Sequence, residues 1–180
     1  MKLRENAVEL VKWKDGDAIW EFPGNRYKAA EVWREIRPKM EKVSWHKLIW
    51  ATFVVPKHAF ISWLAVLNRL PTKERIKAWG LEVDEKCVMC RNAEETRDHV
   101  FFGCAFSRKI WKEVLALCGK AREVTSWREE LEWATSRLKG KSLSSTILRI
   151  AWNAAIYFIW IERNKRIYQE KEGTMTQMEQ

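Results

Sequence analysis

The chain of 180 residues carries a net charge of +9, and 47% of its residues are hydrophobic. These values exclude an intrinsically disordered protein and indicate one domain, either alone or with a tail. The basic balance favours a polyanionic partner, meaning nucleic acid or an anionic membrane surface. No apolar leader follows Met1, and the longest apolar stretch, 150–161, is shorter than the about 20 residues that span a bilayer. We therefore expect a nuclear or cytoplasmic protein that is not secreted and has no membrane partner.

The predicted elements form a mostly α-helical domain with a short N-terminal β segment. Residues 1–15 have a mixed pattern and are expected to be flexible, whereas residues 17–22 read as a strand or extended segment before a turn at Pro23 and Gly24. Apolar residues at helical spacing predict helices at about 28–37, 44–53, 56–67, 72–79, 107–117, 126–138 and 144–168. We expect one domain at 16–169, followed by a disordered tail at 170–180.

Several of these helices have end signals in the sequence. Pro38 ends the first predicted helix, and Ser44 is expected to cap the next one. That helix carries three apolar residues, Leu48, Ile49 and Phe53. Pro56 opens the following helix. Its apolar residues at helical spacing are Phe60, Trp63, Leu64 and Leu67. Gly80 stands where a C-terminal cap is expected.

Three cysteines and one histidine follow the pattern Cys87-x2-Cys90-x8-His99-x4-Cys104. Two cysteines separated by two residues form a tight turn that presents both thiolates to one ion. Three thiolates and one imidazole complete a tetrahedral shell with no open position, which is typical of structural zinc. We therefore predict one structural Zn²⁺ in a knuckle at 84–104. The alternative is a set of buried free thiols beside a surface histidine.

The remaining metal-binding residue types have structural interpretations. Cys118 lies on an apolar helix face and is expected to be a buried thiol, with a spare or substitute ligand as the alternative. His46 and His58 lie in helical context near tryptophans and are expected to be packed or exposed side chains. The twelve tryptophans are expected to anchor the core, and stacking platforms or partner contacts are the alternative for some of them.

Several segments carry a family resemblance in their order along the chain. They are Trp45-His-Lys-Leu-Ile-Trp50, Val55-Pro-Lys-His-Ala-Phe-Ile-Ser-Trp63, Arg69-Leu-Pro-Thr-Lys73, the two-cysteine turn, His99-Val-Phe-Phe-Gly-Cys104 and Lys109-Ile-Trp111. Together they resemble the zinc-binding domain of plant LINE-type (non-LTR) retrotransposon reverse transcriptases. The entry segments Asp17-Ala-Ile-Trp20 and Tyr27-Lys-Ala-Ala30 and the trailing segment 157–164 extend the resemblance over about residues 15–168.

The resemblance implies an accessory domain that helps a polyprotein to bind its RNA or target DNA during reverse transcription. Val88 and Met89 depart from the small or proline residue usual inside the two-cysteine turn. The sequence contains no aromatic-x-Asp-Asp polymerase signature, no Gly-rich phosphate loop and no motif around a Ser, His and Asp set. We therefore predict no enzymatic activity and no small-molecule substrate.

Basic residues flank the predicted knuckle, which is itself acidic. Residues 81–98 hold three Lys/Arg and six Asp/Glu, a net charge of 3 − 6 = −3, and the spacer 91–98 is expected to be a surface loop. RNA or DNA would then contact the basic helices on either side. The candidate residues are Arg69, Lys73, Arg75, Lys77, Arg108, Lys109 and Lys112. Arg69, Lys73 and Lys77 would share one helical face if a helix continued through Pro71. The alternative is a solvated charged face.

A protein-interaction module is the second functional hypothesis. The last predicted helix concentrates apolar residues nearly all the way round its axis, as in a central core helix or a helix that meets another chain. These residues are Ile150, Trp152, Ile156, Tyr157, Ile159, Trp160 and Ile161. Under this hypothesis a host-adopted copy keeps the scaffold and has lost nucleic-acid binding.

Overall fold

The computed structural model describes residues 11–14, 17–20, 43–138, 140 and 142–178. The chain divides into two compact units, 1–42 and 43–180. The predicted turn at Pro23 and Gly24 and the predicted helix at 28–37 lie outside the described residues, and the predicted domain boundaries stay predictions. Within the described part of the chain, no helix combines the length and apolar character that crossing a bilayer requires.

The first unit contains an antiparallel hairpin of two short strands. β1 spans Val11–Lys14 and β2 spans Asp17–Trp20, with Val11 opposite Trp20 and Lys14 opposite Asp17. β2 confirms the predicted extended segment, while β1 falls in the stretch that was expected to be flexible. The two residues between the strands in the sequence are Asp and Gly, a dipeptide that favours hairpins.

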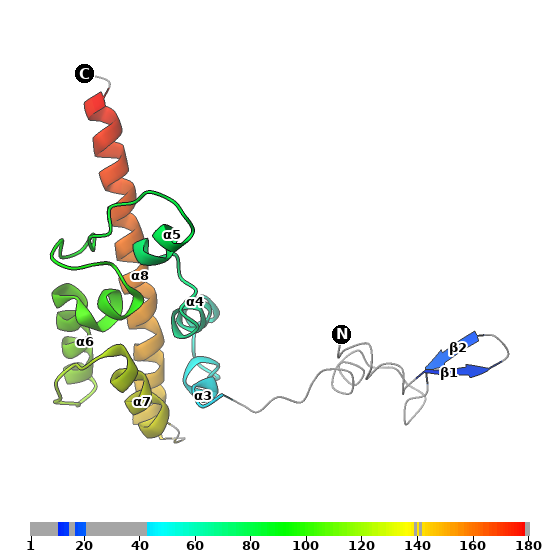
Figure 1. Cartoon of the computed structure of the whole chain (residues 1–180). Helices are drawn as coiled ribbons and strands as arrows, with labels where there is room; N and C mark the ends of the chain where they lie inside the picture. The colour runs from blue at the N-terminus through cyan, green and yellow to red at the C-terminus, as the bar shows by residue number, and fades with distance from the viewer. Residues whose placement is uncertain (1–10, 15–16, 21–42, 139, 141, 179–180) are drawn as a thin grey trace. The chain divides into compact units, whose positions relative to one another are not determined.

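The second unit is helical, which confirms the predicted fold class. Its elements are α3 (His46–Ile49), α4 (Pro56–Val66), α5 (Lys73–Ala78), a π-helical turn η1 (His99–Gly103), α6 (Ala105–Leu117), α7 (Trp127–Arg137) and α8 (Leu143–Met178). The long helix α8 contacts both α4 and α6, which lie on its two sides (Figure 1). The turn η1 contacts α6, α7 and α8, so the segment between two predicted metal ligands lies at the centre of the packing.

The core around η1 is built from aromatic rings. The ring of Phe102 lies 5.3 Å from Trp152 of α8, 5.5 Å from Trp127 of α7 and 6.1 Å from Trp111 of α6. The rings of Trp111 and Trp152 meet edge to face at 5.5 Å, and both side chains are fully buried. Large rings in such arrangements bury much apolar surface and add about 0.5–1.5 kcal/mol per pair. Phe102 therefore fixes the chain between His99 and Cys104 to the core.

The buried face of α4 differs from the expected one. Small side chains face inward, together with one histidine: His58, Ala59, Ser62 and Ala65. Of the predicted apolar residues, Phe60 is 50% exposed and Leu67 is 36% exposed, whereas Trp63 and Leu64 are partly buried and pack against the edge of the core. Small residues allow the backbone of α4 to approach α8 closely, and this long-range packing outweighs the local pattern of large apolar side chains.

Other helix ends partly follow the sequence signals. Pro56 stands at the first turn of α4, and Gly80 has a left-handed backbone with φ of +84° after α5, as expected. Ser44 does not cap α3, which begins after Trp45 without a side-chain cap. Phe53 lies beyond α3 and is 70% exposed, whereas Leu48 and Ile49 lie within α3 and are buried.

The last helix is longer than predicted. α8 begins at Leu143 and ends at Met178, so residues 170–178 are helical where a disordered tail was expected. One glycine, Gly173, destabilises a helix interior by only about 1 kcal/mol relative to alanine. Most residues around it are good helix formers, such as Glu, Lys, Gln and Met.

Candidate metal centre

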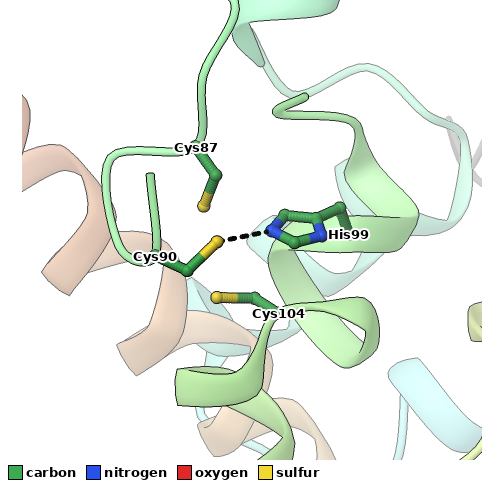
Figure 2. Close-up of side chains that lie close together, drawn as sticks. All are labelled: Cys87, Cys90, His99 and Cys104. Carbon is green, nitrogen blue, oxygen red and sulfur yellow. Dashed lines mark hydrogen bonds between the residues drawn. The ribbon is translucent and has the colours of Figure 1, made fainter. Parts of the chain in front are cut away.

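The four predicted ligands converge on one point in the structure (Figure 2). Their sulfur and imidazole nitrogen atoms all lie within 4.8 Å of one another, and Cys90 Sγ lies 3.2 Å from His99 Nε2. Ligands at ordinary zinc distances of about 2.1–2.3 Å are separated by about 3.4–3.8 Å at the corners of a tetrahedron. The donor set therefore fits one zinc ion. Among the described residues, no other group of this kind occurs.

A tight turn presents the first two ligands. The Arg91 N–H donates to the carbonyl of Cys87, and the Cys87 N–H donates to the carbonyl of Ala93, both at 2.8 Å. Arg91 adopts a left-handed backbone with φ of 59°, which reverses the chain directly after Cys90. The isolated bridge between Lys86 and Glu94 closes the base of the loop. The thiols of Cys87 and Cys90 thus point toward His99 and Cys104 (Figure 2).

The π-helical turn η1 places the other two ligands together. The Cys104 N–H donates to the carbonyl of His99 at 2.6 Å, a hydrogen bond that joins residues five apart. This is the ligand spacing His-x4-Cys, so the backbone geometry brings the imidazole and the thiol to the same side. A Cβ at Gly103 would lie 3.3 Å from the carbonyl of Asp98 and 3.4 Å from His99 Nδ1, so a larger residue there would require a small shift of these neighbours.

The two buried cysteines, Cys87 and Cys104, are hydrogen-bonded to each other. The thiol of Cys87 donates a hydrogen bond to Cys104 and lowers the pKa of Cys104 to about 7, with further help from the N–H groups of Phe106 and Ser107. The same hydrogen bond and burial raise the pKa of Cys87. Cys104 is the N-cap of α6, where a helix N-terminus favours a thiolate. Zinc would replace the shared proton, because metal ligation requires deprotonated thiols.

A buried ion pair fixes the metal loop to α8. Glu95 Oε1 accepts hydrogen bonds from Arg163 Nε and from the Lys73 N–H, both at 3.0 Å, and Arg163 also donates to the carbonyl of Pro71 at 3.2 Å. Glu95 is fully buried and Arg163 is 4% exposed. The expected surface position of the spacer 91–98 is therefore wrong for Glu95. The pair joins residues 68 positions apart, and nothing in the sequence marked it.

Arg166 of α8 makes a second contact with the knuckle. Its guanidinium donates to the carbonyl of Met89, inside the two-cysteine turn, at 3.5 Å. It also lies 4.5 Å above the ring of Phe106 and pairs with Glu162 at 2.7 Å. The turn that holds the metal ligands thus contacts a residue of α8 that lies 77 positions further along the chain.

Arg69 lies between α4, which ends at Val66, and α5, which begins at Lys73, so Arg69, Lys73 and Lys77 do not share one face of a continuous helix. Lys73 is 7% exposed; its ammonium donates to the carbonyl of Lys86 at 2.7 Å and lies 3.6 Å from Asp84. Arg69 is exposed, Arg75 lies over the ring of Trp79, and Lys77 pairs with Glu85. Lys73 is therefore held inside the protein.

The predicted residues after the knuckle lie on the surface of α6. Arg108, Lys109 and Lys112 are all exposed. Arg108 Nε donates to the carbonyl of Phe102 at 3.2 Å, and Lys112 pairs with Glu123 at 2.6 Å. Their contact with nucleic acid stays a prediction. Cys118 is half-buried outside the metal cluster.

A comparison with known protein families also indicates zinc binding in this segment. Residues 27–111 match the family model described as zinc-binding in reverse transcriptase. The match is shorter than the predicted 15–168 but includes all four ligands. No curated protein and no solved structure matches the chain. Residues 27–111 are therefore similar to the zinc-binding domain of reverse transcriptases, and Cys87, Cys90, His99 and Cys104 form a site that fits a single zinc ion.

Proposed function

We propose that this domain is a non-catalytic, zinc-stabilised accessory domain of plant LINE-type retrotransposon origin that contributes RNA or DNA binding to reverse transcription. The observation that carries the proposal is the closed ligand set. Four protein ligands fill a tetrahedral shell and leave no position for water or substrate. The metal then stabilises the fold, and surface residues of the folded domain contact the RNA or DNA.

The surface closest to the metal ligands in the sequence is the start of α6. Cys104 is both a ligand and the N-cap of this helix, so the zinc site fixes the position of Arg108, Lys109 and Lys112. The exposed pair between Lys112 and Glu123 contributes little stability and exchanges readily for a phosphate contact. Such contacts neutralise phosphates without reading bases, which suits an accessory domain.

A salt titration of zinc-loaded protein against fluorescein-labelled RNA and DNA tests the proposal. The logarithm of the binding constant is expected to fall linearly with the logarithm of the salt concentration, with a slope of about 0.7–0.9 per phosphate contact. The double variant Arg108→Glu/Lys109→Glu should bind more weakly and reduce the slope by about 1.4–1.8. Arg128→Glu reverses one charge at an 85% exposed position of α7, away from α6; it is the control for a reversal of surface charge, at half the change in net charge of the double variant.

Two results would contradict the proposal. One is wild-type protein that shows no salt-dependent binding to RNA or DNA. The other is a double variant that binds like the Arg128→Glu control. Charge reversal at Lys73 is not a suitable test, because this buried ammonium has partners inside the protein. Lys77→Glu, at an exposed position of α5, tests the other basic group.

A protein-interaction module remains the second candidate, and one observation favours it. A hollow of about 600 Å³ lies between α6 and α8. Its lining is mainly apolar and includes Phe106, Ile110, Val114, Phe158 and Ile161. Phe158 is 60% exposed and Ile161 is 42% exposed, whereas the other side of α8 is core. A mass measurement in solution separates the candidates: a stable complex favours this module, and a monomer with salt-sensitive binding favours nucleic acid.

A further inference from the structure

A strip of aromatic rings lies on the outer side of α3 and α4. The ring of Trp63 is 6.4 Å from that of Trp50, at the end of α3, and 5.8 Å from that of Phe60. Trp50 is 47% exposed, Phe60 is 50% exposed and Trp63 is half-buried. The three rings therefore form one continuous surface with Trp63 at its centre, and we call it the aromatic strip.

The packing of α4 explains how the rings of Phe60 and Trp63 are placed. Its inner face holds Ala59, Ser62 and Ala65 against α8, so Phe60 points outward, while Trp63 lies between the two faces, half-buried and packed against the edge of the core. Large apolar groups exposed together usually mark a contact surface. The rings are inclined to one another by 53° and 47°, so they are not stacked on one another.

The charged residues of the segment that carries the aromatic strip have one sign. Residues 43–72 contain Lys47, Lys57 and Arg69 and no Asp or Glu, a net charge of +3. Lys47 precedes Trp50 by three residues and Lys57 precedes Phe60 by three, a separation that brings side chains to the same side of a helix. Both lysines are exposed. Each outer ring thus has a lysine one turn before it in the sequence, and the ammonium of Lys57 lies 5.2 Å from the ring of Tyr157 of α8.

We propose that the aromatic strip is a stacking surface for the bases of single-stranded nucleic acid, with Lys47 and Lys57 contacting the phosphates. The inference rests on the proposed function and adds a second binding surface to the one on α6. Exposed rings on a segment that carries cations and no carboxylate suit a polyanion whose bases have free faces. A duplex hides those faces, so the strip selects single strands.

The test is fluorescence anisotropy of the full, zinc-loaded chain with a labelled uridine-rich RNA of about 20 nucleotides, long enough for a site of about 4–16 nucleotides. Trp50→Ala and Phe60→Ala should each weaken binding about 5- to 150-fold, the equivalent of about 1–3 kcal/mol per stacked base. The salt slope should stay unchanged, because no phosphate contact is lost. Tyr168→Ala, at a 66% exposed aromatic position of α8, should bind like wild type.

Conservative variants separate stacking from folding. Trp50→Phe keeps a ring and should retain most of the affinity, whereas Phe60→Leu keeps an apolar side chain without a ring and should lose it. The same RNA in a duplex should bind more weakly to the wild type than the single strand does. Circular dichroism of each variant is the control for folding, and the helical signal should equal that of the wild type.

The outcomes distinguish this inference from the proposed function. If Phe60→Leu and Trp50→Ala bind like wild type while Arg108→Glu/Lys109→Glu binds weakly, the aromatic strip is not a binding surface and the proposed function stands. Equal binding of duplex and single strand to the wild type also overturns the inference. If the wild type binds neither RNA nor DNA, both the proposed function and the stacking surface are wrong.

Discussion

Replacing Arg163 with Met is expected to destabilise the protein strongly. The fully buried carboxylate of Glu95 would lose the guanidinium that accompanies it and keep the N–H of Lys73 as a donor to Oε1. Its other oxygen, Oε2, has no hydrogen-bond partner in the structure. Removing one partner of a buried ion pair typically costs about 3–5 kcal/mol, because an uncompensated charge remains in the interior.

This loss converts to a measurable shift in melting temperature. Domains of about 150–250 residues lose about 2–4 °C per kcal/mol, so Arg163→Met should melt on the order of 10 °C lower than wild type. Urea unfolding of the zinc-saturated protein, followed by circular dichroism, gives the free energy of unfolding directly. The Arg163–Glu95 pair lies outside the ligand shell, so zinc content should be measured in parallel.

A double variant separates the ion pair from simple loss of packing. Glu95→Gln/Arg163→Met keeps an acceptor for the Lys73 N–H and leaves neither charge in the interior. It should therefore be more stable than Arg163→Met alone. A single variant within about 1 kcal/mol of wild type, or a double variant less stable than the single one, would refute the role assigned to the pair.

Two further predictions concern the rest of the core. Glu130→Ala should cost about 3–5 kcal/mol in urea unfolding, since this fully buried carboxylate accepts hydrogen bonds from Trp111 and Arg122, whereas Glu132→Ala, which breaks an exposed pair, should cost at most about 0.5 kcal/mol. Similar losses of unfolding free energy in Glu130→Ala and Glu132→Ala would contradict this prediction. Burial lowers the pKa of His58 from its ordinary 6.5, so the folded state disfavours the charged imidazole, and the stability His58 contributes is present above pH 6.5 and lost as the pH falls through its lowered pKa. The difference in unfolding free energy between wild type and His58→Gln should therefore shift against the wild type on acidification, and a difference independent of pH would contradict this.

The metal site was predictable because its chemistry lies within a short stretch of chain. Residue type and spacing define the ligands from Cys87 to Cys104, and the turns that bring them together form within the same segment. The π-helical geometry of η1 could not be named in advance. The five-residue hydrogen bond nevertheless matches the His-x4-Cys spacing visible in the sequence.

The orientation of α4 was not predictable from its own sequence. The spacing of Phe60 and Leu67 marks one face, but α8 accepts the face with small residues, and α8 lies about 90 residues later in the chain. A local pattern shows which residues share a face. It does not show which face the rest of the protein can pack closely.

Buried charges were also beyond the reach of sequence patterns. Lys73, Glu95 and Arg163 belong to residue types that are rarely buried without partners, so a surface position was the natural expectation. Their burial depends on one another and on contacts between segments far apart in the sequence. The same contacts change Lys73 from a candidate phosphate ligand into a structural residue.

The thermal melt of the protein before and after verified zinc removal tests the central claim most directly. Structural zinc contributes on the order of 10 kcal/mol to folding in small zinc domains, so the metal-free chain should lose helical signal and melt at a much lower temperature. Cys118→Ser should bind one zinc and melt like wild type, whereas Cys104→Ser should resemble the metal-free chain. An unchanged melt after the metal has been removed would contradict a structural zinc site at these four residues.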